Sequence, residues 1–162
     1  CHAPHNANTT VPNSPLWNHQ VTSQTFTPYS SNSLDAVTGQ PSGVSKLCLS
    51  CHDGLTAVDN YGGSTDGTWF ITGREQMGTD LSNDHPISFV YDPALANSDG
   101  ELNDPSNTTT VLGGTIQNDL LSGGTTMECS SCHDVHNGYS YNPELLKITM
   151  NGSTLCLTCH AK

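Results

Sequence analysis

The sequence predicts a chain that is mostly coil, with short helices, a few short strands and little regular secondary structure. Its 162 residues are 33% hydrophobic and 6% aromatic, which is thin for a globular core. Fifteen glycines and nine prolines accompany many serines, threonines and asparagines, so turns should be frequent. Such a polypeptide alone would struggle to offset the entropy of ordering its backbone. We therefore expect a group other than the polypeptide to supply much of the core.

Three complete Cys-x-x-Cys-His motifs indicate what that group is. They are Cys48-Leu-Ser-Cys51-His52, Cys129-Ser-Ser-Cys132-His133 and Cys156-Leu-Thr-Cys159-His160. In this motif each cysteine forms a thioether to one porphyrin, and the histidine ligates the iron. A zinc half-site or a redox dithiol also uses two cysteines at this spacing, but neither needs a histidine at the same offset three times. The motifs predict a multihaem c-type cytochrome in which the polypeptide wraps a stack of haems.

The first two residues resemble the end of a fourth motif, because the chain contains an internal repeat. The matching segments are Cys1-His2-Ala-Pro-His5-Asn6 with Cys132-His133-Asp-Val-His136-Asn137, and Ser45-Lys-Leu-Cys48-Leu-Ser-Cys51-His52 with Ser153-Thr-Leu-Cys156-Leu-Thr-Cys159-His160. A lipid-modified N-terminal cysteine or a chance pair would not explain this repeat. We therefore expect a haem at Cys1 and His2, with the other cysteine of this motif upstream of the sequence. In chain order, the four motifs are called the first to fourth haem sites.

Two copies of one unit then form a single haem-cored domain of residues 1–162. The first repeat spans residues 1 to about 54, and the second spans about 127–162. Between them lies a loop and strand insert of about residues 55–126, in which Gly-Gly and Asp-Gly pairs separate short apolar runs. Residues 68–72 and 87–91 are the predicted strands. Folding should depend on haem, as the folding of small metallodomains depends on metal.

The eight histidines divide into two sets of four. Those that follow a motif cysteine are His2, His52, His133 and His160, and the spare ones are His5, His19, His85 and His136. Four covalently bound haems with four spare histidines predict bis-histidine ligation, in which every iron is six-coordinate. Methionine is the other common axial ligand, but Met77, Met127 and Met150 are interpreted as packing against porphyrin faces. Because this count leaves no open iron, we predict an electron carrier and not an enzyme.

The spacing within CHxxHN suggests which haem each spare histidine serves. Its second histidine follows the first by about one helical turn, so it shares a face with it but cannot reach the same iron. We expect His136 to reach back to the haem of the second site. His19 and His85, both expected on loops, would complete the haems of the first and third sites. Pro86 biases His85 towards an extended conformation that suits a ligand on a loop.

His5 occupies in the first repeat the place that His136 holds in the second. If His5 also reaches back to a preceding unit, that unit belongs to another molecule, and its partner is the His160 haem of that molecule. The alternative is that His5 ligates the His52 haem within its own chain. A head-to-tail contact of the first kind does not close into a ring and propagates as a filament.

The net charge of the chain limits which classes of molecule it can bind. The chain has fifteen acidic and four basic residues and a formal net charge of −11, so nucleic acid is not an expected partner. The basic residues are Lys46, Arg74, Lys147 and Lys162. They cannot pair both propionates of four haems, so most propionates must meet solvent, backbone N–H groups or hydroxyls. One acidic run comprises Asp92, Asp99, Glu101 and Asp104. It could in principle hold calcium, but it lacks a recognisable loop pattern. We interpret it as a solvated face.

Location follows from the chemistry of attachment. Thioethers to haem form outside the cytoplasm, so we expect an exported protein without a remaining signal peptide. No apolar run approaches the roughly 20 residues that span a bilayer. The protein is therefore expected in the extracellular space or at the cell surface, with the periplasm as the alternative.

Six segments together resemble the doubled-CxxCH cytochromes of metal-reducing bacteria. They are CHAPHNA (1–7), PLWNH (15–19), YSS (29–31), SKLCLSCHDG (45–54), DHPISFVYD (84–92) and ECSSCHDVHNG (128–138). With its expected count of four haems, its N-terminal CHxxH and its CLTCHAK tail, the chain is more narrowly similar to the extracellular cytochromes of the OmcE and OmcS kind, which polymerise into nanowires. The resemblance implies a filament with a continuous chain of parallel-stacked and T-shaped haem pairs. It also implies that one iron is ligated by a histidine from the next subunit.

The predicted function is extracellular electron transfer through bis-histidine haems in a conductive filament. Its partners would be further copies of this chain, upstream redox cytochromes, and extracellular acceptors such as a mineral, an electrode or a partner cell. A discrete periplasmic or surface tetrahaem shuttle is the alternative. A multihaem reductase would need an open coordination site, for which the histidine count leaves no room.

Overall fold

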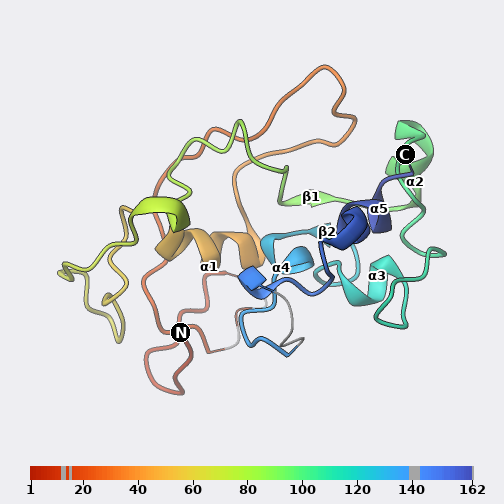
Figure 1. Ribbon diagram of the computed structural model, residues 1–162. Coiled ribbons are helices and arrows are strands. Elements are labelled where there is room, and N and C mark those ends of the chain that lie inside the picture. Colours follow the sequence, from red (N-terminus) through yellow and green to blue (C-terminus); the bar gives the residue numbers. More distant parts are fainter. Residues whose placement is uncertain (12–13, 15, 139–142, 162) are drawn as a thin grey trace. The chain divides into compact units, whose positions relative to one another are not determined.

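The computed structural model describes residues 1–11, 14, 16–138 and 143–161 (Figure 1). Most of the chain is coil. The helices are α1 (Gly43–His52), α2 (Pro93–Asp99), α3 (Ile116–Asp119), α4 (Cys129–Cys132) and α5 (Thr154–Cys159), with 3-10 turns η1 (Gly73–Glu75), η2 (Pro143–Leu145) and η3 (Asn151–Ser153). Strands β1 (Phe89–Val90) and β2 (Thr126–Met127) form a two-stranded sheet. The predicted fold class is confirmed, including the short helices that carry the cysteine motifs.

The chain divides into two compact units. The N-terminal unit comprises Cys1–Ser30 and Thr38–Ser88, and the C-terminal unit comprises Ser31–Val37 and Phe89–Lys162. The first and second haem sites belong to the N-terminal unit, and the third and fourth belong to the C-terminal unit. The predicted domain boundaries stay predictions.

Helix α1 organises the N-terminal unit by burying one face in two small apolar clusters. Leu47 packs with Val11 and Trp17, whereas Leu49 packs with Phe26 and Leu81. Ser45 and Ser50 lie on the same buried face, and the Ser50 hydroxyl donates to the Lys46 carbonyl. The Ser50 hydroxyl also accepts a bond of 2.9 Å from the Thr22 backbone N–H. The helix therefore fixes the loop that follows His19 as well as its own cysteines.

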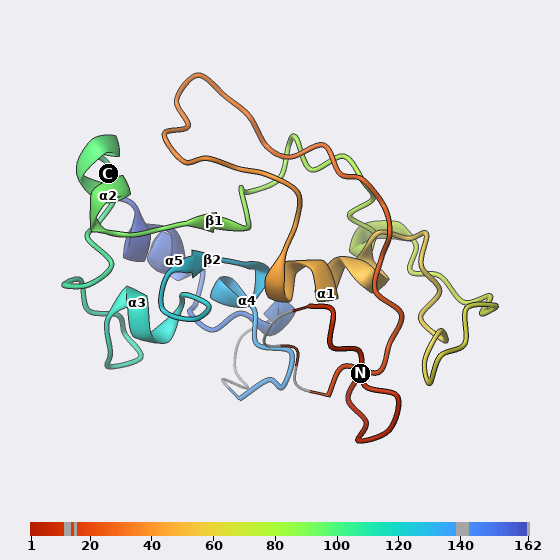
Figure 2. The ribbon, with the colours of Figure 1, turned by 180° about the vertical axis from the view of Figure 1, so that it is seen from behind.

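The C-terminal unit has the larger apolar core. Strands β1 and β2 run antiparallel, with Phe89 opposite Met127 and Val90 opposite Thr126, and the two lie side by side in both views (Figures 1 and 2). The inward side chains Phe89 and Met127 join a buried cluster whose other members are Tyr91, Ala96, Ile116, Leu120, Leu121 and Ile148. Leu155 and Cys159 of α5 pack against this cluster. The core thus reaches the fourth haem site directly.

The insert differs from its prediction in two respects. Residues 68–72 form no strand in the described structure, while β1 lies within the other predicted run, 87–91. Helix α2 was not predicted, although its ends carry clear signals. The Asp92 side chain accepts from the Leu95 N–H, Pro93 begins the helix, and Gly100 ends it in the left-handed conformation. Asp92, which the sequence placed in a solvated acidic run, therefore caps a helix.

Candidate haem-binding sites

The cysteines of each complete motif lie on one turn of helix. Cys48 and Cys51 belong to α1, Cys129 and Cys132 to α4, and Cys156 and Cys159 to α5. Residues three apart share a helix face, so each pair of thiols is directed towards one partner. His52 is the last residue of α1, whereas His133 and His160 follow α4 and α5 in extended backbone. The motif therefore occurs in two local forms.

Three of the four predicted sites share one backbone arrangement, an antiparallel bridge at the histidine that follows the motif cysteine. The paired residues are His2 with Trp17, His133 with Leu146, and His160 with Leu102. In each bridge, the N–H after the histidine donates to the carbonyl before the opposing residue. The three donor and acceptor pairs are Ala3 to Leu16 (2.9 Å), Asp134 to Leu145 (2.7 Å) and Ala161 to Glu101 (2.8 Å).

The second hydrogen bond of each bridge is also the same. The N–H after the opposing residue donates to the carbonyl of the cysteine before the histidine. The pairs are Asn18 to Cys1 (2.8 Å), Lys147 to Cys132 (2.8 Å) and Asn103 to Cys159 (2.8 Å). Cys1 and His2 are therefore held in the same register as the ends of two complete motifs.

This register places an apolar side chain beside each of the three bridged histidines. The two residues of each bridge form a non-hydrogen-bonded antiparallel pair, the type with the shorter Cα–Cα distance. Their side chains are therefore neighbours on one face. The His2 and Trp17 rings meet edge to face with centroids 6.2 Å apart. Leu146 and Leu102 hold the corresponding positions in the third and fourth sites.

The first and third sites also agree in their unusual backbone angles. Leu16 and Leu145, which precede the opposing residues, have φ of 52° and 59°. Asn6 and Asn137, which end the two CHxxHN segments, have φ of 55° and 52°. Positive φ is uncommon for residues other than glycine, and asparagine tolerates it better than most. The sequence repeat is thus a repeat of backbone conformation.

The second site is held by hydrogen bonds around the end of α1. Asp53 is fully buried, and its carboxylate accepts from the Thr22 hydroxyl (2.6 Å), the Thr56 hydroxyl (2.8 Å) and the Leu55 and Thr56 N–H groups (both 2.8 Å). Burial tends to raise the pKa of Asp53, but these hydrogen bonds outweigh it and hold the pKa below its usual value. The His52 carbonyl accepts from the Met77 N–H at 2.8 Å.

Two of the motif histidines are oriented by backbone carbonyls. Nδ1 of His52 lies 2.7 Å from the Glu75 oxygen, and Nδ1 of His133 lies 2.8 Å from the Glu144 oxygen. A carbonyl oxygen can only accept, so each Nδ1 carries the proton. In the neutral imidazole, Nε2 then keeps the lone pair that ligates a metal. Both histidines fit the role of a haem ligand.

The second cysteine of each complete motif fits thioether attachment better than thiolate chemistry. Among the described residues, none of the seven cysteines forms a disulfide. Burial is the main cause that raises the pKa of Cys51 and of Cys132, and that raises the pKa of Cys159 to about 12. Zinc sites and redox dithiols need thiolates, which such surroundings disfavour, whereas a thioether sulfur carries no charge. Within the described ranges, no group of three or more His, Cys, Asp or Glu side chains is arranged to hold a bare metal ion.

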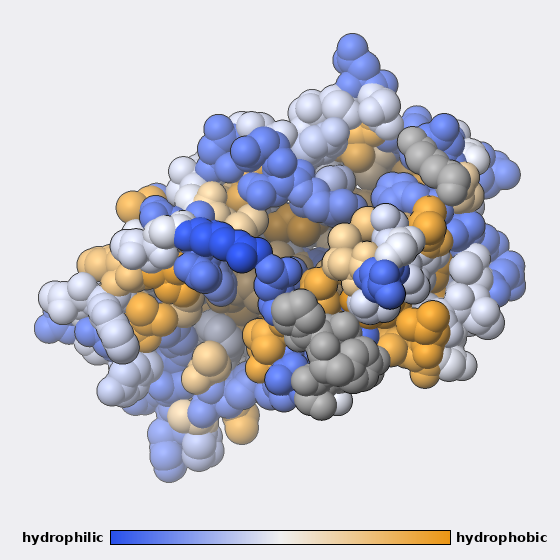
Figure 3. Space-filling model, in the orientation of Figure 1, coloured by the Kyte–Doolittle hydropathy of each residue, from blue (hydrophilic) through white to orange (hydrophobic). Residues whose placement is uncertain are grey.

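Exposed apolar side chains accompany all four sites. They are Leu16 at the first, Leu55 at the second, Val135 at the third and Leu157 at the fourth. Figure 3 shows such apolar side chains in orange among polar neighbours on one face of the molecule. A porphyrin is a large apolar surface, and burial of each of these side chains against one would be favourable. The donor set and its apolar surroundings therefore fit a c-type haem, whose iron would exchange one electron at a time.

Among the spare histidines, His19 is buried. Its Nδ1 lies 2.7 Å from the Gln20 oxygen and its Nε2 lies 3.0 Å from the Ala57 oxygen. Nε2 is also 3.6 Å from the Cys51 sulfur. Ligation of an iron by His19 therefore requires its imidazole to exchange the Ala57 contact for the metal. Its assignment to the haem of the first site stays a prediction.

The other spare histidines, His5, His85 and His136, are exposed. Nδ1 of His85 lies 2.9 Å from the Pro86 oxygen, and Nδ1 of His136 lies 3.7 Å from the Asp134 carboxylate. The expected helical turn within CHxxHN is wrong, because α4 ends at Cys132 and a turn follows it. The haems that these three histidines serve stay predictions.

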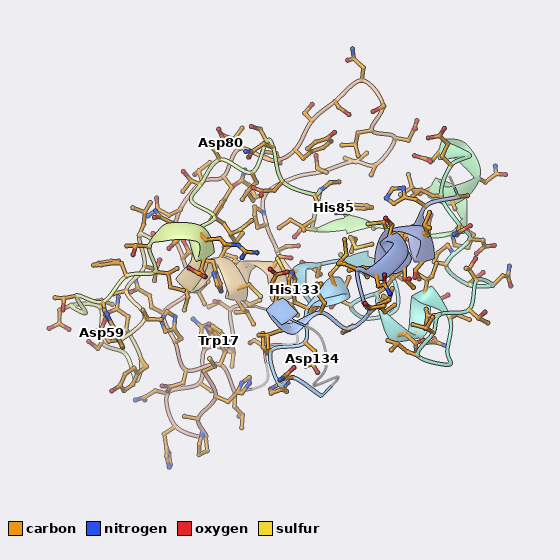
Figure 4. The ribbon with its side chains drawn as sticks, in the orientation of Figure 1. Trp17, Asp59, Asp80, His85, His133 and Asp134 are labelled. Atoms are coloured by element: carbon orange, nitrogen blue, oxygen red, sulfur yellow. The ribbon has the colours of Figure 1, made fainter. Side chains whose placement is uncertain are left out.

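Sequence reasoning missed the groups that position the ligands. Trp17 and Asp53 lie inside segments used for the resemblance, but neither had been given a role. The opposing segments 101–103 and 145–147 carry no motif, because backbone groups form their bridges. Figure 4 labels Trp17 and His133, which belong to two of these bridges.

Comparison with known proteins adds one finding. Residues 123–162 match the family described as the doubled CxxCH motif. This region contains the complete motifs of the third and fourth sites. No curated protein matches the chain. The family match supports a multihaem c-type cytochrome.

The doubled CxxCH motif indicates covalently bound c-type haem, and it suggests electron transfer. An electron carrier is the role that the family suggests. In the described parts of the chain, no helix has the length and apolar character needed to cross a membrane.

Proposed function

We propose that this chain is a tetrahaem electron carrier whose irons are ligated by His2, His52, His133 and His160. The observation that carries the count of four is the bridge that the first site shares with the third and fourth. Cys1 and His2 occupy the register of two complete motifs, with an apolar residue opposite the histidine in each case. A chance Cys-His pair gives no reason for this equivalence.

Bis-histidine ligation is the second part of the proposal. Four spare histidines match four haems without remainder, and both His52 and His133 have Nδ1 engaged so that Nε2 remains for the metal. Each haem then acts as a relay that is oxidised and reduced by its neighbours. The role of the protein is to fix axial ligands, spacing and local dielectric.

Polymerisation into an extracellular filament is the third part. His5 is exposed and corresponds to His136 in a repeat that extends to the backbone angle of the following asparagine. If His5 ligates the fourth-site haem of another copy, the junction is head-to-tail and propagates. A metal–ligand bond at each junction would keep the haem chain continuous. The resemblance to filament-forming cytochromes supports this proposal, and the discrete periplasmic or surface shuttle is its alternative.

The haem count is tested on the mature protein by intact mass and by the pyridine haemochromogen spectrum. Four haems per chain support the proposal, and three refute the site at His2. Electron paramagnetic resonance should then give low-spin ferric signals, and a dominant high-spin signal would contradict bis-histidine ligation. Binding of cyanide or carbon monoxide by the native protein would favour the enzyme alternative.

Electron microscopy of the native protein separates a filament from a shuttle. The His5→Ala variant should assemble poorly and leave one five-coordinate haem per chain, which carbon monoxide would reveal. His136→Ala is the matched control, because it removes the corresponding histidine of the second repeat and should perturb a haem within the chain. Normal filaments of His5→Ala with four intact bis-histidine haems would rule out the proposed junction.

A further inference from the structure

Trp17 presents an unusual feature at the first haem site. Its side chain is 8% exposed and packs with Val11 and Leu47 of the N-terminal unit. Its indole Nε1 is the one buried side-chain nitrogen or oxygen without a hydrogen-bond partner among the described residues. A buried donor left without an acceptor destabilises the folded state.

The other bridges show that apolar packing does not require an indole here. Leucines hold the place of Trp17 opposite the ligand histidines of the third and fourth sites. A leucine has no polar atom to satisfy, so the N–H group distinguishes the first site from its two counterparts. A buried tryptophan normally finds an acceptor for this N–H.

The rings next to Trp17 do not supply that acceptor. His2 lies on one side and His19 on the other, with ring centroids 6.2 and 6.1 Å from the indole. Both nitrogens of His19 already lie at hydrogen-bond distance from backbone carbonyls. Trp17 and His19 are two residues apart in extended backbone, so their side chains lie on one face.

The haem proposed at His2 would supply acceptors beside Trp17, because each c-type haem carries two carboxylates. The chain has only four basic residues, so other donors must serve most propionates. An N–H bond to a carboxylate is also stronger than a bond to a neutral oxygen. We propose that Trp17 donates its indole N–H to a propionate of the haem ligated by His2.

This inference rests on the proposed haem at the first site. It gives that haem a property that the other bridged sites lack. The positive end of the N–H dipole lies beside the propionate and favours the extra electron of the ferrous state. Loss of the N–H therefore lowers the midpoint potential of this haem, by up to about 59 mV for a tenfold change in the one-electron equilibrium.

The experiment uses the second tryptophan of the chain as its control. Trp69 is 75% exposed, and the Trp69→Phe protein leaves Trp17 as the only indole. Ultraviolet resonance Raman spectra of this haem-loaded variant should place the N–H band of Trp17 in the range for a bonded indole. Visible excitation should detect a propionate band that shifts in Trp17→Leu, the residue type of the other bridges. Spectroelectrochemistry should show one haem with a lowered potential.

Replacement of tryptophan by 3-benzothienylalanine in the Trp69→Phe background removes the N–H but keeps the shape of the ring. The same propionate shift in this protein supports the inference even where Trp17→Leu folds poorly. A non-bonded N–H band, or unchanged propionate bands and potentials in both variants, overturns it. A bonded N–H band with unchanged propionate bands shows that water is the acceptor and also overturns it. Three haems per chain would refute the proposed function itself, whereas four haems with any of these negative results refute only the inference.

Discussion

The second of the proposed haem sites and its three counterparts hold the motif histidine by different means. His52 closes a ten-residue helix whose end is tied down by the buried Asp53 carboxylate. His2, His133 and His160 lie in extended backbone, each opposite a residue of a second segment. The motif residues alone thus do not determine what surrounds the histidine. Segments outside the motif supply those surroundings.

The second site and the bridged sites also differ in the groups that hold them together. Asp53 accepts four hydrogen bonds through one carboxylate, so a single side chain holds the second site together. The bridges use backbone N–H and C=O groups, which survive most substitutions. We therefore expect the second site to be sensitive to one residue, and the bridged sites to respond mainly to changes in packing.

The largest effect is expected for Asp53→Ala. The substitution leaves the buried Thr22 and Thr56 hydroxyls and two N–H groups without an acceptor, which should lower the free energy of unfolding by on the order of 4 kcal/mol. Denaturant unfolding of the haem-loaded protein measures this loss. Visible spectra should show perturbation of the His52 haem first.

Asp134→Ala is the matched control for this prediction. Asp134 follows His133 as Asp53 follows His52, but within the described part of the chain its carboxylate accepts hydrogen bonds from the His136 and Gly138 N–H groups and from no buried hydroxyl. These donors are exposed and can bond to water instead. A loss of about 1 kcal/mol or less is expected. Equal losses in the two variants would remove the proposed distinction between the sites.

The motifs and the repeat could be predicted because they depend on residue types at fixed offsets. Cysteine and histidine carry specific chemistry, and an asparagine at the end of CHxxHN suits a positive φ. The bridges could not be predicted, since any residue except proline can donate a backbone N–H. Leu102 and Leu146 therefore look like ordinary core residues. The orphaned N–H of Trp17 depends on burial, which sequence alone does not give.

A smaller effect is expected where an opposing leucine is truncated. Leu146 is 8% exposed, so Leu146→Ala should cost about 2–3 kcal/mol and loosen the packing beside His133. Leu102 is only partly buried, and Leu102→Ala should cost about half as much. Denaturant unfolding gives the free energies, and the g-values of the low-spin ferric signals report the orientation of each imidazole.

In both variants, the bridge hydrogen bonds should persist, because they involve only backbone groups. Hydrogen exchange of the Lys147 and Asn103 N–H groups tests this expectation. Loss of protection at Lys147 in Leu146→Ala would show that the bridge depends on its side chain. The bridged sites would then also depend on a side chain, and they would differ from the second site only in how strongly.

The smallest effects should come from the two asparagines at positive φ, and they test whether the first and third sites are equivalent. Asn6→Ala and Asn137→Ala each place an alanine in the left-handed region, at a cost of about 1 kcal/mol. Asn6 additionally donates to the Gly62 carbonyl, so its variant should lose slightly more. Glycine at either position should relieve the backbone cost. Asn32→Ala, at an exposed residue without positive φ, serves as the control. These costs arise from the same backbone angle at two repeats, so a cost at Asn137 with none at Asn6 would mean that the first repeat does not adopt this angle of the second. The structural argument for a haem at His2 would then rest on the backbone bridge alone.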